Sequence, residues 1–478
     1  MSIVMNYEAM FGGGSELVTD RLLPEILPVT IRESVIKKAC GAARKKKTWL
    51  LIFVVGTKPC FYKFWGSIAA AEEKGLPYFI VNAGQHYDSL LTYGSKEFGY
   101  DDRIAVNLSI RGDLAQKAGE IVFKMGWLAK HLKKTAPDVT SVPVVLGDTI
   151  LTNTVPMAWM YSIHGKAIHN EAGLRSMSPS VVRNIAKNIA PNSFVERQIS
   201  GGWELMNIEP FPEQYDTFTA SAGCEFLFAP MEINRQHLLR EGYRPENIFV
   251  IGGAVVDALE LKLKEKPSKS IFSTFPVLAD GEWIRVDIHR KENLTRRRLG
   301  AIVGAVADLV KKKYRVNFVE MNATRIALEQ FGIKNDLLKL RKHRNFLYTP
   351  IWQEYAQVIE FYRSPHCLLA LTDSGGLQEE LNMIGKPCLT RRFNTDRPET
   401  IIEGRGNLLV PPFSGDFIVR MVEHVVKSES LFERMHRPKR LYGTGAGREF
   451  IDIVAGLARQ RKKMFTWSHE RLGLWREK

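Results

Sequence analysis

The chain has 478 residues and a formal net charge of +15, with 45% apolar and 25% charged residues. This length predicts two or three domains, and the composition is typical of a globular protein with a large core. No apolar run approaches the roughly 20 residues that span a bilayer, and no basic segment followed by an apolar one opens the chain, so neither a membrane protein nor a secreted one is expected.

The cysteines and the distribution of positive charge indicate the cellular compartment and the kind of partner. The five cysteines are scattered without CxxC spacing, which indicates neither a disulfide framework nor a zinc site and favours the cytoplasm. Lysine and arginine gather at residues 44–47, 311–313 and 461–463. This charge has two explanations: a polyanionic partner such as nucleic acid, or a site for one anionic ligand plus ordinary surface lysines.

The first part of the chain predicts an α/β domain. Residues 1–47 are expected to be an N-terminal extension, in which residues 31–43 have the pattern of a short amphipathic helix. From Trp49 onward, β-rich runs alternate with helix-compatible stretches, which predicts parallel sheets with helices on both faces. The expected strands are residues 50–55, 78–82, 142–146 and 166–169, and a long helix is expected at 114–134.

A second alternating series follows, and the junction between the two is expected near residues 242–252. Its expected strands are residues 247–251, 283–288, 315–321, 367–371 and 387–390. The resulting domain boundaries are 1–47, 48–246, 247–444 and 445–478, and the last of these segments holds a helix and a basic, aromatic tail.

The most informative run is Thr372-Asp373-Ser374-Gly375-Gly376, which joins an apolar strand to a helix. Glycines at such a turn let the backbone approach a ligand, and the helix N-terminus suits a diphosphate. Glu379 and Glu380 follow in the first turn, where a carboxylate can accept hydrogen bonds from both hydroxyls of a ribose. The run therefore indicates a nucleotide site. An ordinary glycine-rich turn with helix-stabilising acids is the alternative.

Polar residues also follow several of the other predicted strands. In parallel sheets, ligands bind beyond the carboxyl ends of the strands. Any one of these residues alone would be a turn residue or a helix cap, but their corresponding places indicate one shared site. They are Lys58, Gln85, Asp148, Glu171 and Asp373.

Taken together and in order, these motifs give the chain a resemblance to the UDP-N-acetylglucosamine 2-epimerase family over roughly residues 49–460. The matching runs are Gly56-Thr57-Lys58-Pro59 with Lys63, Gly84-Gln85-His86, Gly147-Asp148-Thr149, His169-Asn170-Glu171-Ala172-Gly173-Leu174-Arg175, Pro212-Glu213, Ala229-Pro230, His289-Arg290-Lys291-Glu292, Asp373–Glu380, and Gly385-Lys386-Pro387 through Arg392 to Asp396-Arg397-Pro398-Glu399. The resemblance implies the GT-B fold: two Rossmann-like domains facing a central cleft, with a C-terminal helix that returns to the first domain.

The resemblance also implies the reaction, which is inversion of C2 in UDP-GlcNAc to give UDP-ManNAc. The C2 proton is barely acidic, so UDP leaves C1 as that proton is removed, and UDP then adds back to the resulting glycal. Asp148, Glu171 and Glu213 match the family's catalytic carboxylates, with the acid and base roles left open, and His289 matches its active-site histidine. Capping by Asp148 and Glu171, and a structural histidine at 289, are the alternatives.

Further residues match the family's substrate-binding positions, and no metal or cofactor is implied. The resemblance assigns Ser374, Gly375 and Gly376 to the diphosphate and Glu380 to the ribose. It also implies a homodimer. The remaining substrate-binding candidates are Lys58, Lys63, Gln85, Arg175, Arg392 and Arg397.

Some positions depart from the family pattern. Lys58 stands where arginine is usual, and the run Gln214-Tyr215-Asp216-Thr217 after Glu213 is atypical. Residues 176–211 are much longer than their family counterpart and join two catalytic carboxylates, so they are expected to form a long loop over the cleft. These departures and the basic charge support a rival hypothesis, a GT-B glycosyltransferase that uses a UDP-sugar on a large acceptor, nucleic acid among them. A non-catalytic binding module is a third reading.

Overall fold

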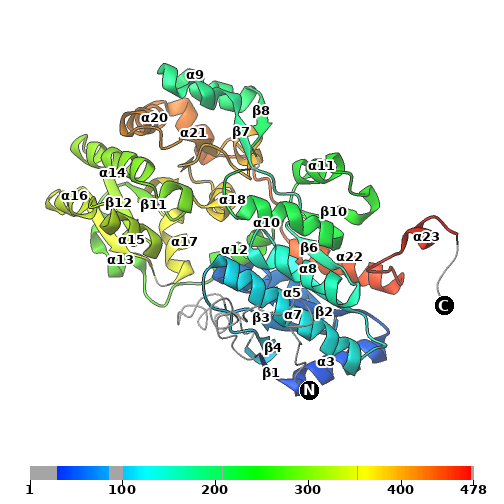
Figure 1. Ribbon diagram of the computed structural model, residues 1–478. Helices are drawn as coiled ribbons and strands as arrows, with labels where there is room; N and C mark the ends of the chain where they lie inside the picture. The colour runs from blue at the N-terminus through cyan, green and yellow to red at the C-terminus, as the bar shows by residue number, and fades with distance from the viewer. Residues whose placement is uncertain (1–28, 85–98, 100, 207, 353, 475–478) are drawn as a thin grey trace, which may run out of the picture.

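The computed structural model describes residues 29–84, 99, 101–206, 208–352 and 354–474. They form two α/β lobes, an N-terminal one at the bottom of Figure 1 and a C-terminal one at its upper left. Each lobe is built on its own sheet, and a separate pair of short strands, within residues 177–205, comes between two strands of the N-terminal sheet in the sequence.

The N-terminal sheet has eight strands, all parallel to their neighbours except β1, which is antiparallel to β4. Apart from β1 at the edge, the order has the reversal about the first strand, β2, that marks a Rossmann-like sheet. In spatial order the strands are β1 (Thr30–Ile31), β4 (Ile104–Asn107), β3 (Tyr78–Asn82), β2 (Leu50–Val55), β5 (Ser141–Leu146), β6 (Ala167–Asn170), β9 (Cys224–Ala229) and β10 (Ile248–Val250).

Alternation along β2 explains why helices cover both faces of this sheet. Leu50, Ile52 and Val54 pack into one apolar core, whereas Leu51, Phe53 and Val55 pack into another. A strand buried on both faces carries the continuous apolar run seen here. The helices of this lobe are α3 (Glu33–Lys46), α4 (Lys58–Lys63), α5 (Trp65–Glu73), α7 (Leu114–Thr135), α8 (Ile150–Ile163), α10 (Glu213–Ala220) and α11 (Glu232–Arg240).

The C-terminal sheet has six strands, all parallel, and its order reverses between β11 and β14. Ligands bind at such a reversal, beyond the carboxyl ends of the strands. The strands are β13 (Phe346–Pro350), β12 (Arg315–Glu320), β11 (Trp283–Asp287), β14 (Cys367–Thr372), β15 (Cys388–Thr390) and β16 (Asn407–Leu409).

Helices again flank this second sheet, and the two Rossmann-like lobes together give the expected GT-B fold. The helices are α12 (Ala254–Lys264), α13 (Ile271–Thr274), α14 (Arg296–Lys311), α15 (Asn322–Gln330), α16 (Lys334–Lys339), α17 (Tyr355–Arg363), α18 (Gly375–Ile384), α19 (Glu399–Ile402), α20 (Gly415–Lys427) and α21 (Glu429–His436).

After the C-terminal lobe, helix α22 (Ala446–Arg459) returns to the N-terminal lobe, and α23 (Ser468–Arg471) follows it (Figure 1). The Phe450 ring lies 4.6 Å from that of Phe228 in the core of the N-terminal sheet. The glycine at 447 permits this approach, because a Cβ there would lie 2.3 Å from the backbone nitrogen of Ser67.

Residues 176–211 differ from the long loop expected over the cleft. They form the antiparallel strands β7 (Met177–Pro179) and β8 (Trp203–Leu205), the 3-10 helix η2 (Ser180–Lys187) and α9 (Pro191–Ser200). Their apolar side chains, Phe194 and Val181 among them, belong to the core of the C-terminal lobe. The segment is therefore part of that lobe, and assigning it to the first domain was wrong.

Specific hydrogen bonds hold this inserted segment in place. The backbones of Met177 and Thr395 exchange two hydrogen bonds of 2.8 Å. The Gln198 side chain donates to the Leu409 carbonyl and accepts from the Leu409 amide, both at 2.9 Å. In Figure 1, α9 accordingly lies beside α20 at the top of the view.

Two further differences concern residues 30–46 and the number of strands. Residues 30–46, expected to be an extension, supply β1 and α3, and Ile36 of α3 is buried in the N-terminal core. The strands β4, β9, β13 and β16 were not expected.

In the described residues, no helix is long and apolar enough to cross a membrane.

We predict that Phe194→Ala lowers the free energy of unfolding by about 3–5 kcal/mol, because it leaves a cavity in the C-terminal core. The Phe194 ring is fully buried and lies 5.2 Å from that of Phe417. Urea unfolding followed by circular dichroism measures the change. Phe123→Ala, at a position 64% exposed, is the control. Equal midpoints for both variants would show that the inserted segment is not part of this core.

Candidate active site

The carboxyl ends of the two sheets meet where the lobes join, and most of the predicted site residues lie at this junction. The turn after β14 comes from the C-terminal sheet. Ser374 caps α18, and its hydroxyl accepts a hydrogen bond from the Leu377 amide at 3.4 Å. A Cβ on Gly375 would lie 3.5 Å from the guanidinium of Arg290, so the turn faces a cation on the neighbouring loop. A helix N-terminus beside an arginine is suited to an anion.

Asp373 connects this turn to the loop after β11. Its fully buried carboxylate accepts hydrogen bonds from the backbone amides of His289 and Arg290, each at 3.0 Å, and from the Asn293 side chain at 2.9 Å. The His289 ring nitrogen Nδ1 lies 3.2 Å from an Asp373 oxygen, and the His289 side chain is 34% exposed. The Asp373 carboxylate therefore orients the His289 ring, and part of that ring remains accessible to a ligand.

Arg290 and Glu213 form an ion pair between the lobes, with 2.5 Å between Nη1 and Oε1. Glu213 is the first residue of α10, on the N-terminal side of the junction. Burial raises the pKa of Glu213, the guanidinium of Arg290 opposes that shift, and the charge of Asp148 adds to it. Of the three matched carboxylates, Glu213 and Asp148 are thus close enough to influence each other.

Asp216, one turn after Glu213, adds another carboxyl group to this cluster. Burial raises the pKa of Asp216 to about 7; a hydrogen bond from Asn153 opposes the shift, and the charges of Asp148 and Glu213 add to it. Its Oδ1 lies 3.4 Å from the Asn153 amide nitrogen. This residue was not among the predicted site residues, because the atypical run after Glu213 gave no signal for it.

Glu171 lies on the same side of the junction, directly after β6, with a positive φ of 61°. Its buried carboxylate forms a 2.6 Å ion pair with the Lys63 ammonium. Burial works to lower the pKa of Lys63, but the carboxylates of Glu171 and Glu379 outweigh it and raise that pKa. Gly147 makes room for this pair, since a Cβ there would lie 3.2 Å from Glu171 Oε2, and the residue after it is Asp148.

Arginines surround a buried acid on the C-terminal side. Arg392 pairs with Asp396 at 3.0 Å, and Arg397 pairs with both Asp396 and Glu379. Burial works to raise the pKa of Asp396, but the guanidinium groups of Arg397 and Arg392 hold it well below its usual range. Burial raises the pKa of Glu380 to about 8, against the effect of the Tyr355 hydroxyl.

One predicted residue, Arg175, stands apart from this cluster, and two others lie wholly or partly outside the described residues. Arg175 is buried in the N-terminal lobe, where its guanidinium forms two 2.7 Å hydrogen bonds to Glu241 and lies 4.6 Å from the centre of the Phe218 ring. Lys58 begins α4, but its side chain lies outside the described part of the structure, as does the whole of Gln85. The remaining predicted residues come together at the junction.

Other residues here were named in motifs but not assigned a role. Arg290 and Asp396 stand inside the matching runs, and their places after β11 and β15 were the available signal. Asp373 was expected at the shared site from its place after β14, but without a role. In the described residues, no group of three or more histidine, cysteine, aspartate or glutamate side chains has a metal-binding arrangement.

Comparison with known proteins identifies relatives over most of the chain. Residues 197–455 match the protein family described as UDP-N-acetylglucosamine 2-epimerase. The UDP-N-acetylglucosamine 2-epimerase of Methanocaldococcus jannaschii is 29% identical over 410 residues, which cover 84% of this chain and 97% of that protein. The Bacillus subtilis protein of the same name is 26% identical over 369 residues, covering 74% and 82%.

Solved structures give the same result. The crystal structure of the Methanocaldococcus jannaschii UDP-GlcNAc 2-epimerase in complex with UDP-GlcNAc and UDP has a TM-score of 0.66 at 26% identity, covering 85% of this chain and 99% of that one. The Neisseria meningitidis UDP-GlcNAc 2-epimerase bound to UDP-GlcNAc has a TM-score of 0.68 at 22% identity, covering 84% and 98%, and shares the fold.

We predict that Asp216→Asn stabilises the protein at pH 8 but not at pH 4. The folded protein keeps the proton on Asp216 up to about pH 7, whereas the unfolded chain releases it near pH 4. Wild-type stability therefore falls as the pH rises between these values, and the asparagine variant escapes that loss. The stability difference should grow by on the order of 2–4 kcal/mol over this range.

Chemical unfolding at a series of pH values measures this difference. Asp308→Asn, at a side chain 50% exposed, is the control and should show no such trend. A difference between Asp216→Asn and wild type that stays constant from pH 4 to pH 8 would contradict the prediction.

Proposed function

The chain belongs to the UDP-N-acetylglucosamine 2-epimerase family, and we propose that it interconverts UDP-GlcNAc and UDP-ManNAc by elimination and re-addition of UDP. The observation that carries this proposal is the meeting of two half-sites. Carboxylates of the N-terminal lobe lie at the same junction as the histidine, the arginines and the helix N-terminus of the C-terminal lobe.

The chemistry explains why both half-sites are needed. Loss of the C2 proton to a base accompanies cleavage of the C1–O bond, whose electron pair leaves with UDP, and a glycal forms. UDP then re-adds to C1 while C2 takes a proton on the opposite face. A base and an acid must flank the hexose, and cations must stabilise the departing diphosphate.

The electrostatic environments of Glu171 and Glu213 favour different roles. Glu171 forms an ion pair with the Lys63 ammonium, and we infer that its carboxylate accepts the C2 proton. Burial raises the pKa of Glu213, which suits it to carry the proton that is returned. We assign Glu171 as the base in the direction from UDP-GlcNAc and Glu213 as the acid. The roles exchange in the reverse direction, as microscopic reversibility requires.

The C-terminal lobe supplies the diphosphate and ribose contacts. Arg290, Arg392 and Arg397 are each paired with carboxylates of the protein, so a bound diphosphate competes with those acids for the same cations. Because burial raises the pKa of Glu380 to about 8, its carboxyl group holds a proton at neutral pH and can donate as well as accept hydrogen bonds at the ribose.

The proposal also covers the cellular location and the oligomeric state of the protein. All five cysteines are buried with free thiols, which supports the expected cytoplasmic location. A homodimer remains a proposal from the resemblance, and no cofactor is invoked for this chemistry. The relatives are named as epimerases, which supports epimerisation over the glycosyltransferase alternative.

We predict that the purified protein converts UDP-GlcNAc to UDP-ManNAc in deuterated buffer with one deuterium incorporated at C2. The glycal step requires this exchange, because the removed proton mixes with solvent before C2 is protonated again. Proton NMR of the sugar signals measures both product and label. Product without label at C2 would exclude elimination, and UDP released only when an acceptor is present would favour the transferase.

We predict that Glu171→Gln lowers kcat by about 10²–10⁴-fold, the usual contribution of a general base, while UDP affinity changes little. The amide keeps the shape of the side chain but cannot take the C2 proton. Turnover by NMR and UDP binding by calorimetry give the two readouts. Glu196→Gln, on the exposed side of α9, is the matched control. An active Glu171→Gln enzyme would refute the assignment of the base.

A further inference from the structure

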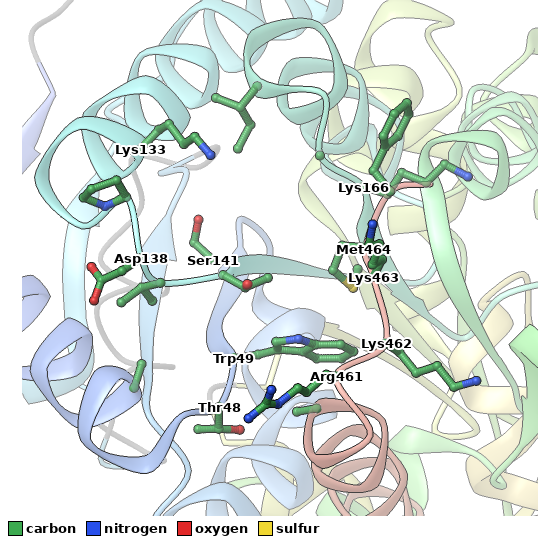
Figure 2. Close-up of a pocket in the computed structure, with 18 of the residues that line it drawn as sticks. Thr48, Trp49, Lys133, Asp138, Ser141, Lys166, Arg461, Lys462, Lys463 and Met464 are labelled. Carbon is green, nitrogen blue, oxygen red and sulfur yellow. The ribbon is translucent and has the colours of Figure 1, made fainter. Parts of the chain in front are cut away.

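A cavity lies in the N-terminal lobe at the amino ends of β2 and β5, away from the junction (Figure 2). We call it the basal cavity. Its volume is about 730 Å³, within the range of small-molecule sites. The junction lies at the carboxyl ends of the same strands. Since β2 has six residues, each rising about 3.3 Å, the two sites are roughly 20 Å apart.

Two of the three basic clusters in the sequence meet at this cavity. Arg44 and Lys47, at the end of α3, line it together with Arg461, Lys462 and Lys463, which follow α22. The third cluster has an ordinary explanation, because its lysines at 311 and 312 form surface ion pairs with Asp308 and Glu423. The fold therefore gathers segments from both ends of the chain into one positive surface.

Carboxylates neutralise only part of this charge. Of the seven cations that line the basal cavity, Arg44 pairs with Asp138, Lys166 with Glu225 and Lys463 with Glu470. Within the described residues, the other cations have no carboxylate at ion-pair distance. They are Lys47, Lys133, Arg461 and Lys462.

Helix dipoles offset part of the positive charge of these four cations. The C-terminal ends of α3, α7, α8 and α22 all border the cavity, and each carries a partial charge of about −0.5. Together they offset about two of the four unpaired cations. An excess of positive charge remains, which suits an anion such as a phosphate monoester.

The lining also has the groups that such an ester requires. Figure 2 shows the Lys133 ammonium and the Arg461 guanidinium entering from opposite sides, with the Ser141 hydroxyl and the Trp49 indole between them. Phosphate oxygens accept from such donors. The apolar wall and the volume, which far exceeds that of a phosphate ion, leave space for an organic group.

We propose that the basal cavity binds a small phosphate monoester, whose charge is balanced by Lys133, Arg461 and the other unpaired cations of the lining and whose organic part lies against Trp49. This site is independent of the proposed epimerase activity. It differs from a nucleic-acid surface, which would follow an extended stripe of cations rather than fill one cavity.

The test uses the full-length protein saturated with UDP, so that the junction is occupied. Calorimetry then measures binding of inorganic phosphate, glucose 6-phosphate and adenosine 5′-monophosphate. We expect at least one of the two esters to bind more tightly than inorganic phosphate, and the tighter ester identifies the organic class. Absence of binding by both esters would overturn the proposal.

Substitutions of lining residues test whether the ester binds in the basal cavity. Lys133→Ala combined with Arg461→Ala should weaken ester binding at least tenfold. Both side chains are exposed, so the thermal midpoint should stay unchanged. Lys37→Ala with Lys38→Ala removes the same charge from the exposed side of α3, outside the cavity, and should leave binding unchanged. Equal weakening by both pairs would show a general charge effect and overturn the site.

Two further measurements keep the test decisive. If the double variant is destabilised, Lys47→Ala alone should still weaken binding severalfold, and no change in this variant would count against the proposal. A single-stranded oligonucleotide that binds the saturated wild type more tightly than either ester, and loses that binding in the double variant, would instead make this face a nucleic-acid surface.

Discussion

The buried carboxylate of Asp373 is the group on which the junction depends. It gathers amide donors from the loop after β11 and the side chain of Asn293, which in turn donates to the Arg391 carbonyl at 2.7 Å. A buried charge is tolerated only when such donors surround it, and removing one side of such an arrangement costs about 3–5 kcal/mol. This group fixes the direction in which His289 and Arg290 leave the sheet.

The loop that Asp373 holds also contacts the N-terminal lobe. Arg290 reaches Glu213, and nearby the rings of Tyr62 and Tyr355 stack with 5.5 Å between their centres. The chain itself also connects the two lobes. The inserted segment follows strands of the N-terminal lobe but packs on the C-terminal lobe, and α22 follows the C-terminal lobe but packs on the N-terminal one. The relative placement of the two half-sites thus rests on ion pairing, aromatic stacking and chain connectivity together.

The large positive charge has two different roles in the structure. At the junction, arginines lie beside buried carboxylates, so charge is nearly balanced and a diphosphate exchanges one anionic partner for another. At the basal cavity, Lys133 and Arg461 have no such partner within the described residues. The sequence alone left open whether the charge serves a polyanion or a single anionic ligand, and the distribution of carboxylates favours the single ligand at both places.

Much of the junction was predictable because its residues follow strands whose apolar runs are local and clear. Asp148, Glu171, His289 and Ser374 each come one or two residues after such a strand, and parallel strands of one sheet place their carboxyl ends along one edge. The missed strands β9 and β16, and the folded segment around Phe194, were harder to predict, because their burial depends on partners elsewhere in the chain. Propensity and pattern hold no information about such partners.

The sequence by itself determined the α/β class, the strand ends that carry the catalytic candidates, and the turn at Ser374, because each depends on residues close together in the chain. Only the tertiary structure decided that Arg175 pairs with Glu241, that Asp216 joins the carboxylate cluster, and that residues 44–47 and 461–463 meet. Those outcomes depend on distances between side chains far apart in sequence, which packing of the whole chain sets.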